Sequence, residues 1–431
     1  MVSIFVLDAD NSTGYKYTDY KNQNRQRETM KTALQLTPDM PRIRGERKTF
    51  CEFFAGIGLV REGLIASGWE CIYANDIDTK KQKAYEARFG KSEHFHLGDV
   101  WKTEEIVERI CERPSLMTAS FPCIDLSLAG HYRGLRGVHS STFFGFANVL
   151  EAMEHRRPPL VMLENVNGLL SSNEGKDFAA IAHRLAGLGY WLDAFVLDAS
   201  HFTPQSRPRV FVVGMTDEIE PDERPQRGYL WPVDEHSMLR TKPILEFKRT
   251  VNLPTGWVTL LLPKPPVRRE TLAEVIDIDD DQEWWDATQV LRHYQMMSNR
   301  HRQQTDEIVT SKLKWVGTIF RRIRQKTMRA EVRFDGLAGC LRTPKGGSAK
   351  QIVIAIDNGK LRMRWMSPRE YARLQGTPDF PLVGNTNQQL WGFADAVCVP
   401  VVSWIDQHVL TPLIQTLHKN SPVRLPMAVA R

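Results

Sequence analysis

The feature that most constrains the fold is an alternation of two kinds of segment between Thr49 and Gly214. Short apolar or β-branched runs are separated by amphipathic stretches with helical spacing. The predicted strands are Thr49–Phe54, Glu70–Asn75, Leu116–Ser120, Leu160–Glu164, Trp191–Asp198 and Arg209–Gly214. The predicted helices are Val60–Ser67, Thr79–Phe89, Thr103–Cys111, Phe143–His155 and Lys176–Leu188. Strands that alternate with helices favour a mostly parallel sheet covered on both faces, so we predict an α/β fold.

The alternation stops after Gly214, where the composition changes. Prolines become frequent, and an acidic segment from Glu274 to Asp286 precedes a basic one. From Arg300 to Lys350 there are 13 Lys and Arg against 4 Asp and Glu, whereas the whole chain has 57 against 51. We therefore predict an N-terminal arm (1–46), an α/β domain (47–216), a smaller inserted domain (217–361), and a segment that completes the α/β domain and ends in a tail (362–431). The arm is expected to hold a short helix around Gln26–Leu34, and the last segment a helix and a short strand, Ala396–Trp404.

Composition excludes several other classes of protein. The chain is 42% hydrophobic and 25% charged, as is typical of a globular protein. Its six cysteines contain no C-x-x-C pair, so neither a disulfide scaffold nor a metal site is predicted, and a reducing cytosol is favoured. The apolar stretch Val2–Leu7 lacks a basic start and is a poor signal peptide. Apolar runs stay well below the roughly 18 residues of a membrane span.

A glycine loop follows the first predicted strand. The segment Phe53–Leu59 reads F-F-A-G-I-G-L and leads into a helix, so its glycines allow a ligand to approach the backbone closely. Asp76 ends the next strand, where a carboxylate can accept ribose hydroxyls, and Asp99 could bind an adenine amino group. G-x-G alone is equally typical of a plain strand-to-helix turn. The third glycine of a pyrophosphate-binding loop is missing (Val60 or Arg61), which favours an adenosine ligand without pyrophosphate, such as S-adenosylmethionine.

Polar, chemically useful side chains follow three other strands. Cys123 lies just after Leu116–Ser120, Glu164 ends Leu160–Glu164, and Gln-Ser-Arg-Pro-Arg (205–209) leads into the last strand. Loops at the carboxyl ends of parallel strands commonly carry chemistry. Buried packing is the commoner explanation for a single cysteine, and a solvated strand end is the plain alternative for Glu164. The three groups together favour an active site.

In this order the motifs resemble those of the DNA cytosine-5 methyltransferase family. The matching segments are F-A-G-I-G (54–58), N-D-I-D (75–78), G-D-V (98–100), P-C (122–123), E-N-V (164–166), Q-x-R-x-R (205–209), M-S-P-R-E (366–370) with R-L-Q-G (373–376), and F-A-D-A-V (393–397). The resemblance covers about 48–216 and 362–405. It implies a Rossmann-like S-adenosylmethionine-dependent methyltransferase fold, with the insert as the target-recognition domain.

The resemblance also implies catalytic roles. Cys123 is the thiolate that adds to C6 of a flipped-out cytosine and thereby activates C5 for methylation. Glu164 contacts N3 and the 4-amino group, where an acid can stabilise the charge that builds during attack. Arg209 contacts O2 of the base, and Arg207 orients the catalytic loop and the backbone. The expected activity is therefore methyl transfer from S-adenosylmethionine to C5 of cytosine within a specific DNA sequence.

Cofactor and DNA contacts are implied in the same way. The residues expected to contact S-adenosylmethionine are Phe54, Ala55, Gly56, Ile57, Gly58, Asp76, Ile77, Asp99, Val100, Pro122, Asp395 and Val397. The residues expected to contact DNA are Ser127, Arg133, Arg136, Arg342, Thr343, Lys345, Gly346 and Gly347. Of the basic segment, Arg321, Arg322, Arg324 and Lys326 suit phosphates. The acidic segment is expected to be a scaffold helix turned away from DNA.

This sequence departs from the family pattern at four positions, of which one, Ile124, replaces the glutamine often found after the catalytic cysteine. Asp76 replaces a common glutamate, which is longer by one methylene. The last motif is usually F-G-N-A/S-V, so Ala394 stands in place of glycine and Asp395 in place of asparagine. An aspartate there adds a negative charge near a cofactor that carries a positive sulfonium.

Three other functions are weighed against this one. They are a tRNA cytosine-5 methyltransferase, a catalytically inactive DNA-binding regulator and a nicotinamide-dependent dehydrogenase. The large basic insert favours double-stranded DNA over tRNA, the presence of Cys123, Glu164 and Arg209 argues against the regulator, and the glycine loop argues against the dehydrogenase. The expected setting is the prokaryotic cytoplasm, with a cognate restriction endonuclease or another phage-defence system as partner. The family implies a monomer on DNA and no contact with membranes.

Overall fold

The computed structural model describes residues 47–91, 93–122, 142–219, 238–260, 262–344 and 349–420. Several predicted features lie outside these residues. They are the short helix around Gln26–Leu34 and the site residues Cys123, Ser127, Arg133, Arg136, Lys345, Gly346 and Gly347.

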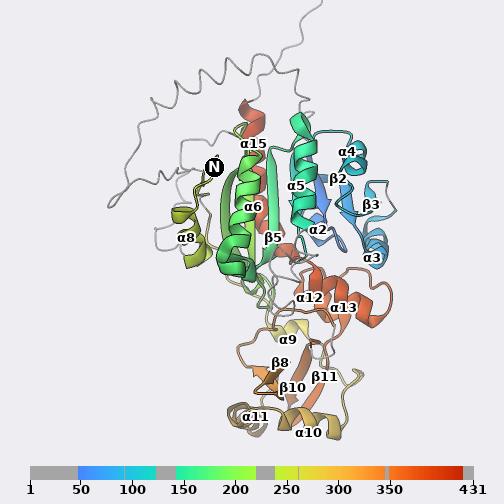
Figure 1. Ribbon diagram of the computed structural model, residues 1–431. Coiled ribbons are helices and arrows are strands. Elements are labelled where there is room, and N and C mark those ends of the chain that lie inside the picture. The colour runs from blue at the N-terminus through green and yellow to red at the C-terminus, as the bar shows by residue number, and fades with distance from the viewer. Residues whose placement is uncertain are drawn as a thin grey trace, which may run out of the picture.

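A large twisted sheet forms the centre of the catalytic domain (Figure 1). Within the described residues its strands are β1 (Lys48–Phe53), β2 (Trp69–Asp76), β3 (Phe95–Leu97), β4 (Leu116–Ala119), β5 (Leu160–Val166), β6 (Trp191–Asp198) and β7 (Pro208–Met215). They are ordered β3-β2-β1-β4-β5-β7-β6, and β7 runs antiparallel to both of its neighbours. This arrangement confirms the predicted Rossmann-like α/β class.

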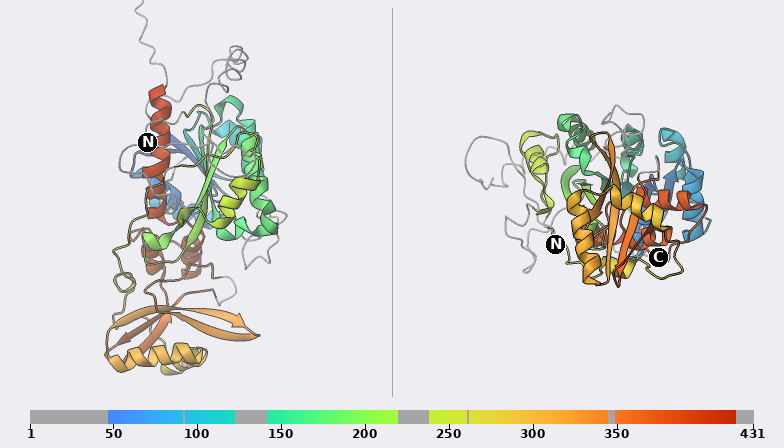
Figure 2. Two further views of the ribbon diagram at one scale, coloured as in Figure 1. Left: turned by 90° about the vertical axis from the view of Figure 1, so that its left-hand side faces the viewer. Right: turned by 90° about the horizontal axis from the view of Figure 1, so that it is seen from below.

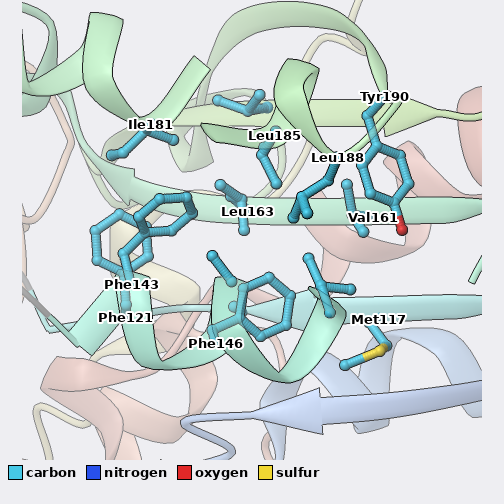
Figure 3. Packing of buried hydrophobic residues seen from close by; sticks show 14 of the residues in the cluster. Met117, Phe121, Phe143, Phe146, Val161, Leu163, Ile181, Leu185, Leu188 and Tyr190 are labelled. Atoms are coloured by element: carbon cyan, nitrogen blue, oxygen red, sulfur yellow. The ribbon is translucent and has the colours of Figure 1, made fainter. Parts of the chain in front are cut away.

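Helices cover both faces of this sheet. One face carries α4 (Thr103–Arg109), α5 (Thr142–Ala152), α6 (Lys176–Gly187) and α8 (Lys242–Thr250). Figure 3 shows how Phe143 and Phe146 of α5 and Leu185 of α6 pack over β4 and β5. The other face carries α2 (Leu59–Ile65), α3 (Thr79–Phe89), α14 (Val399–Ile405) and α15 (Thr411–Asn420). The near-continuous apolar runs of β4 and β5 follow from this burial on both sides.

The predicted strand Ala396–Trp404 is wrong, because this segment forms helix α14. Pro400 lies in the first turn of the helix, where its missing N–H leaves no hydrogen bond unmade. The helix is apolar on most of its surface because it is buried against α2 in the core on this face of the sheet, with Val402 packed against Gly63. Such all-round burial hides the helical period that the sequence would otherwise show.

The smaller domain is built on a second, antiparallel sheet (Figure 2). Its strands, β8 (Trp315–Arg324), β9 (Thr327–Arg333), β10 (Ile352–Asp357) and β11 (Lys360–Trp365), are ordered β11-β10-β8-β9. Helices α10 (Ala287–Gln295) and α11 (Asn299–Ser311) cover the face turned away from the catalytic domain. The helix α9 (Leu272–Val275) packs toward α12 (Pro368–Leu374). Beyond α12, α13 (Thr386–Asp395) lies between the two domains.

The structure differs from two expectations for this insert, which concern its bounds and the helix in its acidic segment. Residues 238–260 pack on the catalytic sheet, where Ile244 and Trp257 join its core, and the expected boundary at 361 falls inside β11. The expected helix in the acidic segment is wrong: apart from α9, the segment is irregular, and Trp284 lies against the guanidinium groups of Arg362 and Arg364. Packing of tryptophan against arginine fixes an irregular segment without helical periodicity.

Among the described residues, the helical run Thr386–Leu417 is long and apolar enough to cross a membrane by length and composition. Most of its apolar surface is already covered, because 67% of its most apolar window is buried inside the protein. We therefore treat the run as part of the core.

Candidate active site

Strand ends that carry the predicted catalytic groups meet at one edge of the central sheet. Phe53 at the end of β1 pairs with Ala119 at the end of β4, which pairs in turn with Leu163 of β5. Strand β7 runs the other way, so that Arg209 near its start lies opposite Val166 near the end of β5. This edge faces α12, α13 and the smaller domain (Figure 1). Parallel strands that share one carboxyl edge place their loops in a common crevice.

Glu164 and Arg209 form an ion pair at this edge. The Nε of Arg209 lies 3.0 Å from Oε1 of Glu164, and the two side chains are only 13% and 9% exposed. The hydroxyl of Ser120, which follows β4, also hydrogen-bonds the Glu164 carboxylate. Burial raises the pKa of Glu164, although Arg209 and Arg207 oppose this effect. The acid is therefore easier to protonate than an ordinary glutamate, as a proton donor to a base requires.

Arg207 is fully buried and hydrogen-bonds backbone carbonyls of both domains. Its Nη2 donates to the carbonyls of Ala394 at 2.8 Å and Ala396 at 2.7 Å, while Nη1 donates to the carbonyl of Leu341 at 3.2 Å. Its own amide donates to Asp198 at 2.7 Å. A guanidinium suits this position because it carries several donors in a fixed plane. Arg207 thus joins the last motif of the catalytic domain to the segment between β9 and β10 of the smaller domain.

Two residues that sequence reasoning did not single out complete the site. Cys340 lies 3.4 Å from Nη1 of Arg207 and 3.7 Å from Nη2 of Arg209, and although burial opposes it, these two arginines lower the pKa of the thiol. Asn165 donates to the carbonyl of Phe121 at 3.1 Å and so fixes the chain just before Pro122. Asn165 belongs to the E-N-V motif, so a signal for it existed. Cys340 had none beyond its place before Leu-Arg-Thr (341–343).

The glycine loop has the backbone that a bound nucleoside needs. Gly56 has φ +57°, and a Cβ there would meet only the carbonyl oxygen of Phe54, at 3.9 Å, so the space beside it is open. Gly58 has φ +87°, and a Cβ there would lie 2.5 Å from the Phe89 ring, so the turn can pack on α3 only with glycine. Phe54 itself has φ +56°, a strained value for a side chain of its size.

The groups around this loop fit an adenosine cofactor. Asp76 is held by the amides of Gly56 at 2.8 Å and Asp78 at 2.9 Å, which leaves further lone pairs on its carboxylate for ribose hydroxyls. The side chain of Ile77 is 70% exposed, as an apolar surface for a purine ring would be. Asp99 accepts the amide of Trp101 at 3.1 Å and is only half-buried. Donors and acceptors of these kinds match ribose and adenine.

Other expected cofactor residues are placed differently. Ala55, Ile57, Val100 and Val397 are at most 6% exposed and pack in the hydrophobic cores. Because these side chains are buried, contact with a ligand would fall to their backbones. Pro122 is half-buried at the carboxyl edge. Asp395 is paired with Lys81, a residue that sequence reasoning did not include.

The basic segment divides between the two faces of the smaller sheet. Arg322 and Arg324 share Glu331 with distances of 3.5 and 2.8 Å, and all three lie on the face that continues toward the catalytic domain. Arg321 points to the helix-covered face, where its guanidinium lies 4.7 Å from the centre of the Trp365 ring. Of the expected base-reading residues, Arg342 is exposed and Thr343 is half-buried.

The fold and this edge together define a methyltransferase-type α/β domain joined to a basic second domain. Residues 48–410 match the family described as C-5 cytosine-specific DNA methylase, and the chain belongs to this family. It is 25% identical over 364 residues to the Type II methyltransferase M.DsaV of Dactylococcopsis salina, covering 84% of this chain and 86% of that one. It is 26% identical over 362 residues to M.HhaI of Haemophilus parahaemolyticus, covering 84% and 93%.

Solved structures support the same fold. A methyltransferase of Entamoeba histolytica, EhMeth, superimposes with a TM-score of 0.54 at 14% identity, covering 85% of this chain and 99% of that one. The Dnmt2 methyltransferase of S. pombe gives 0.52 at 16% identity with the same coverage. These likenesses show the fold, and the family match makes the chain a C-5 cytosine-specific DNA methylase, as its motifs predict.

Proposed function

We propose that the protein methylates C5 of a cytosine that is flipped out of a specific duplex DNA sequence, with Cys123 as the nucleophile. The thiolate of Cys123 forms a bond to C6, which makes C5 electron-rich. S-adenosylmethionine supplies the methyl group. The C5 proton then leaves and the bond between Cys123 and C6 breaks, so that 5-methylcytosine and the free thiol are restored.

The buried Glu164–Arg209 pair is the observation that carries this proposal. Attack at C6 places negative charge on the ring near N3 and O2. A glutamic acid with a raised pKa can donate to N3, and an adjacent guanidinium can hold O2. Asn165 fixes the carbonyl of Phe121 beside this pair, and Phe121 precedes Cys123 by two residues in the sequence.

The face of the smaller sheet that carries Arg322 and Arg324 supports binding to DNA phosphates. Arg322 and Arg324 both lie on the sheet face that continues toward the catalytic domain, and each is about half-exposed, at 40% and 57%. They share a single carboxylate, Glu331, so the cluster keeps excess positive charge. DNA held between the domains would meet this surface, and such contacts would position the duplex without reading its sequence.

Replacing Arg322 and Arg324 together by glutamine is expected to weaken DNA binding several-fold. The dependence of log Kd on log salt should also become shallower, by up to about 0.9 for each phosphate that the variant no longer neutralises. Fluorescence anisotropy with a labelled duplex at several salt concentrations measures both effects. Arg300→Gln is the matched control, because Arg300 is exposed on α11, on the far side of the sheet. Equal weakening in the control would contradict the assignment of this face.

Transfer of labelled methyl groups to duplex DNA tests the proposed activity directly. The purified protein is expected to label DNA with S-adenosylmethionine as donor, and bisulfite sequencing of DNA from expressing cells should reveal one methylated sequence context. Labelling of tRNA and not of DNA would move the substrate to RNA. DNA binding without labelling would support the inactive regulator. The Type II names of its relatives support a restriction–modification setting, in which the methylated sequence is protected from a cognate endonuclease.

A further inference from the structure

An ion pair joins two helices that come from distant parts of the chain. The Nζ of Lys81 lies 3.1 Å from Oδ2 of Asp395, and the two side chains are 22% and 40% exposed. Lys81 lies in the first turn of α3, and Asp395 is the last residue of α13. The pair therefore connects the segment after β2 with the last motif of the catalytic domain.

The two helices border the glycine loop from different sides. Helix α3 begins two residues after Ile77 and packs against Gly58 through Phe89. Helix α13 reaches the same loop at Gly392, where a Cβ would lie 2.9 Å from Cγ2 of Ile57. The helices also touch each other, and the Lys81–Asp395 pair lies where they meet. Helices α3 and α13 thus border the glycine loop that holds Gly56.

The charges around Lys81 favour a lasting pair. Burial alone would lower the pKa of Lys81, but neighbouring carboxylates outweigh burial and raise it, and they belong to Asp395, Asp76 and Asp78. Asp395 stands where the family pattern has a neutral asparagine. An amide could accept one hydrogen bond from Lys81, but it could not supply the opposite charge. Lys81 and Asp395 are therefore matched to each other within this chain.

Asp395 is also held from its other side. The carbonyls on either side of it, those of Ala394 and Ala396, accept hydrogen bonds from the buried guanidinium of Arg207. The backbone at Asp395 is thus fixed toward the catalytic edge, while its side chain reaches out to α3. Because the end of α13 is fixed in this way, this side of the cofactor site is preorganised for its ligand.

We propose that the Lys81–Asp395 ion pair, called the tie below, holds α3 and α13 together beside the cofactor site. In this role Lys81 is a positioning residue for S-adenosylmethionine. The inference rests on the proposed cofactor site. Because this ion pair acts without requiring contact with the sulfur, it affects the binding of S-adenosylmethionine and also that of its product S-adenosylhomocysteine.

Calorimetric titration with both compounds tests the tie in the full-length chain. Lys81→Met and Asp395→Asn are each expected to weaken binding of both ligands by about 2- to 5-fold, as for a partly exposed pair. The double variant should bind each ligand with about the same affinity as the more affected single variant, because both substitutions remove the same interaction. Lys81→Arg should keep wild-type affinity. The control is Lys83→Met, an exposed lysine of the same helix, which should bind as the wild type does.

The Asp395→Asn result is the sharpest, since it installs the amide of the family pattern and is nevertheless expected to weaken binding. Wild-type affinity in that variant, or effects of the two substitutions that multiply in the double variant, would overturn the tie. A wild-type protein that fails to bind S-adenosylmethionine would overturn the proposed function together with this inference. Melting temperatures of all variants separate loss of the tie from loss of the fold.

Discussion

Cys123→Ser is expected to abolish methyl transfer, with a loss on the order of 10⁴-fold or more, as when the nucleophile of a covalent mechanism is removed. A serine hydroxyl stays protonated at neutral pH and does not add to C6 of cytosine. Transfer of labelled methyl groups to duplex DNA measures the loss, while DNA and cofactor affinity should stay close to wild type. Cys111→Ser is the matched control because Cys111 is an exposed thiol on the outer surface.

A second measurement tests the covalent bond itself. In a duplex with fluorine in place of hydrogen at C5 of the target, the last step cannot proceed, because no C5 proton can leave. The wild-type protein should then accumulate a denaturation-resistant complex with DNA, and Cys123→Ser should form none. Full activity of the serine variant, or trapping that survives the substitution, would refute the role of Cys123.

Glu164→Gln is expected to lower the rate of methyl transfer by about 10²- to 10⁴-fold, the usual contribution of a positioned acid. The amide cannot release a proton to N3, and it also leaves Arg209 without its counter-charge. Single-turnover measurements isolate this step from product release. Glu108→Gln on the exposed side of α4 is the control and should keep wild-type rates.

The pH dependence gives the sign of this effect. Burial raises the pKa of Glu164, so its protonated form persists to higher pH than that of an ordinary glutamate. The wild-type rate should fall as the pH rises through that raised pKa, while ionisation of Cys123 acts in the opposite direction. In Glu164→Gln the falling limb should vanish. A rate profile of unchanged shape in the variant would contradict an acid role for Glu164.

Most strands of the central sheet could be predicted from the sequence, because a strand buried on both faces is a continuous apolar run. Strands β4, β5 and β6 begin at the predicted residues, since apolar runs buried on both faces stand out between amphipathic helices. The strand β3 was missed because Phe95–Leu97 is too short to show a period. The strand assigned to Ala396–Trp404 failed for the opposite reason: α14 is buried nearly all round, and an apolar run without polar positions does not tell helix from strand.

The catalytic groups were predicted from motifs, and their partners were not. The sequence placed Glu164 and Arg209 at strand ends, and the structure brings them within 3.0 Å. Neither Cys340 nor Lys81 could be tied to the site, because each lies far along the chain from the groups it contacts, at Arg207 and Asp395 respectively. The aspartate at 395 was interpreted from the sequence as a negative charge near the sulfonium of the cofactor, and that interpretation did not point to Lys81.

The packing of α14 has a consequence for how the chain folds during synthesis. Helix α2 forms near the start of the catalytic domain, yet it packs against α14, where Val402 fills the space beside Gly63. Trp69 likewise donates its indole N–H to Asp406, at 2.6 Å. The first βα unit therefore keeps an uncovered apolar face until residues 399–406 have been synthesised. Contacts of such long sequence separation slow folding and lengthen exposure to aggregation.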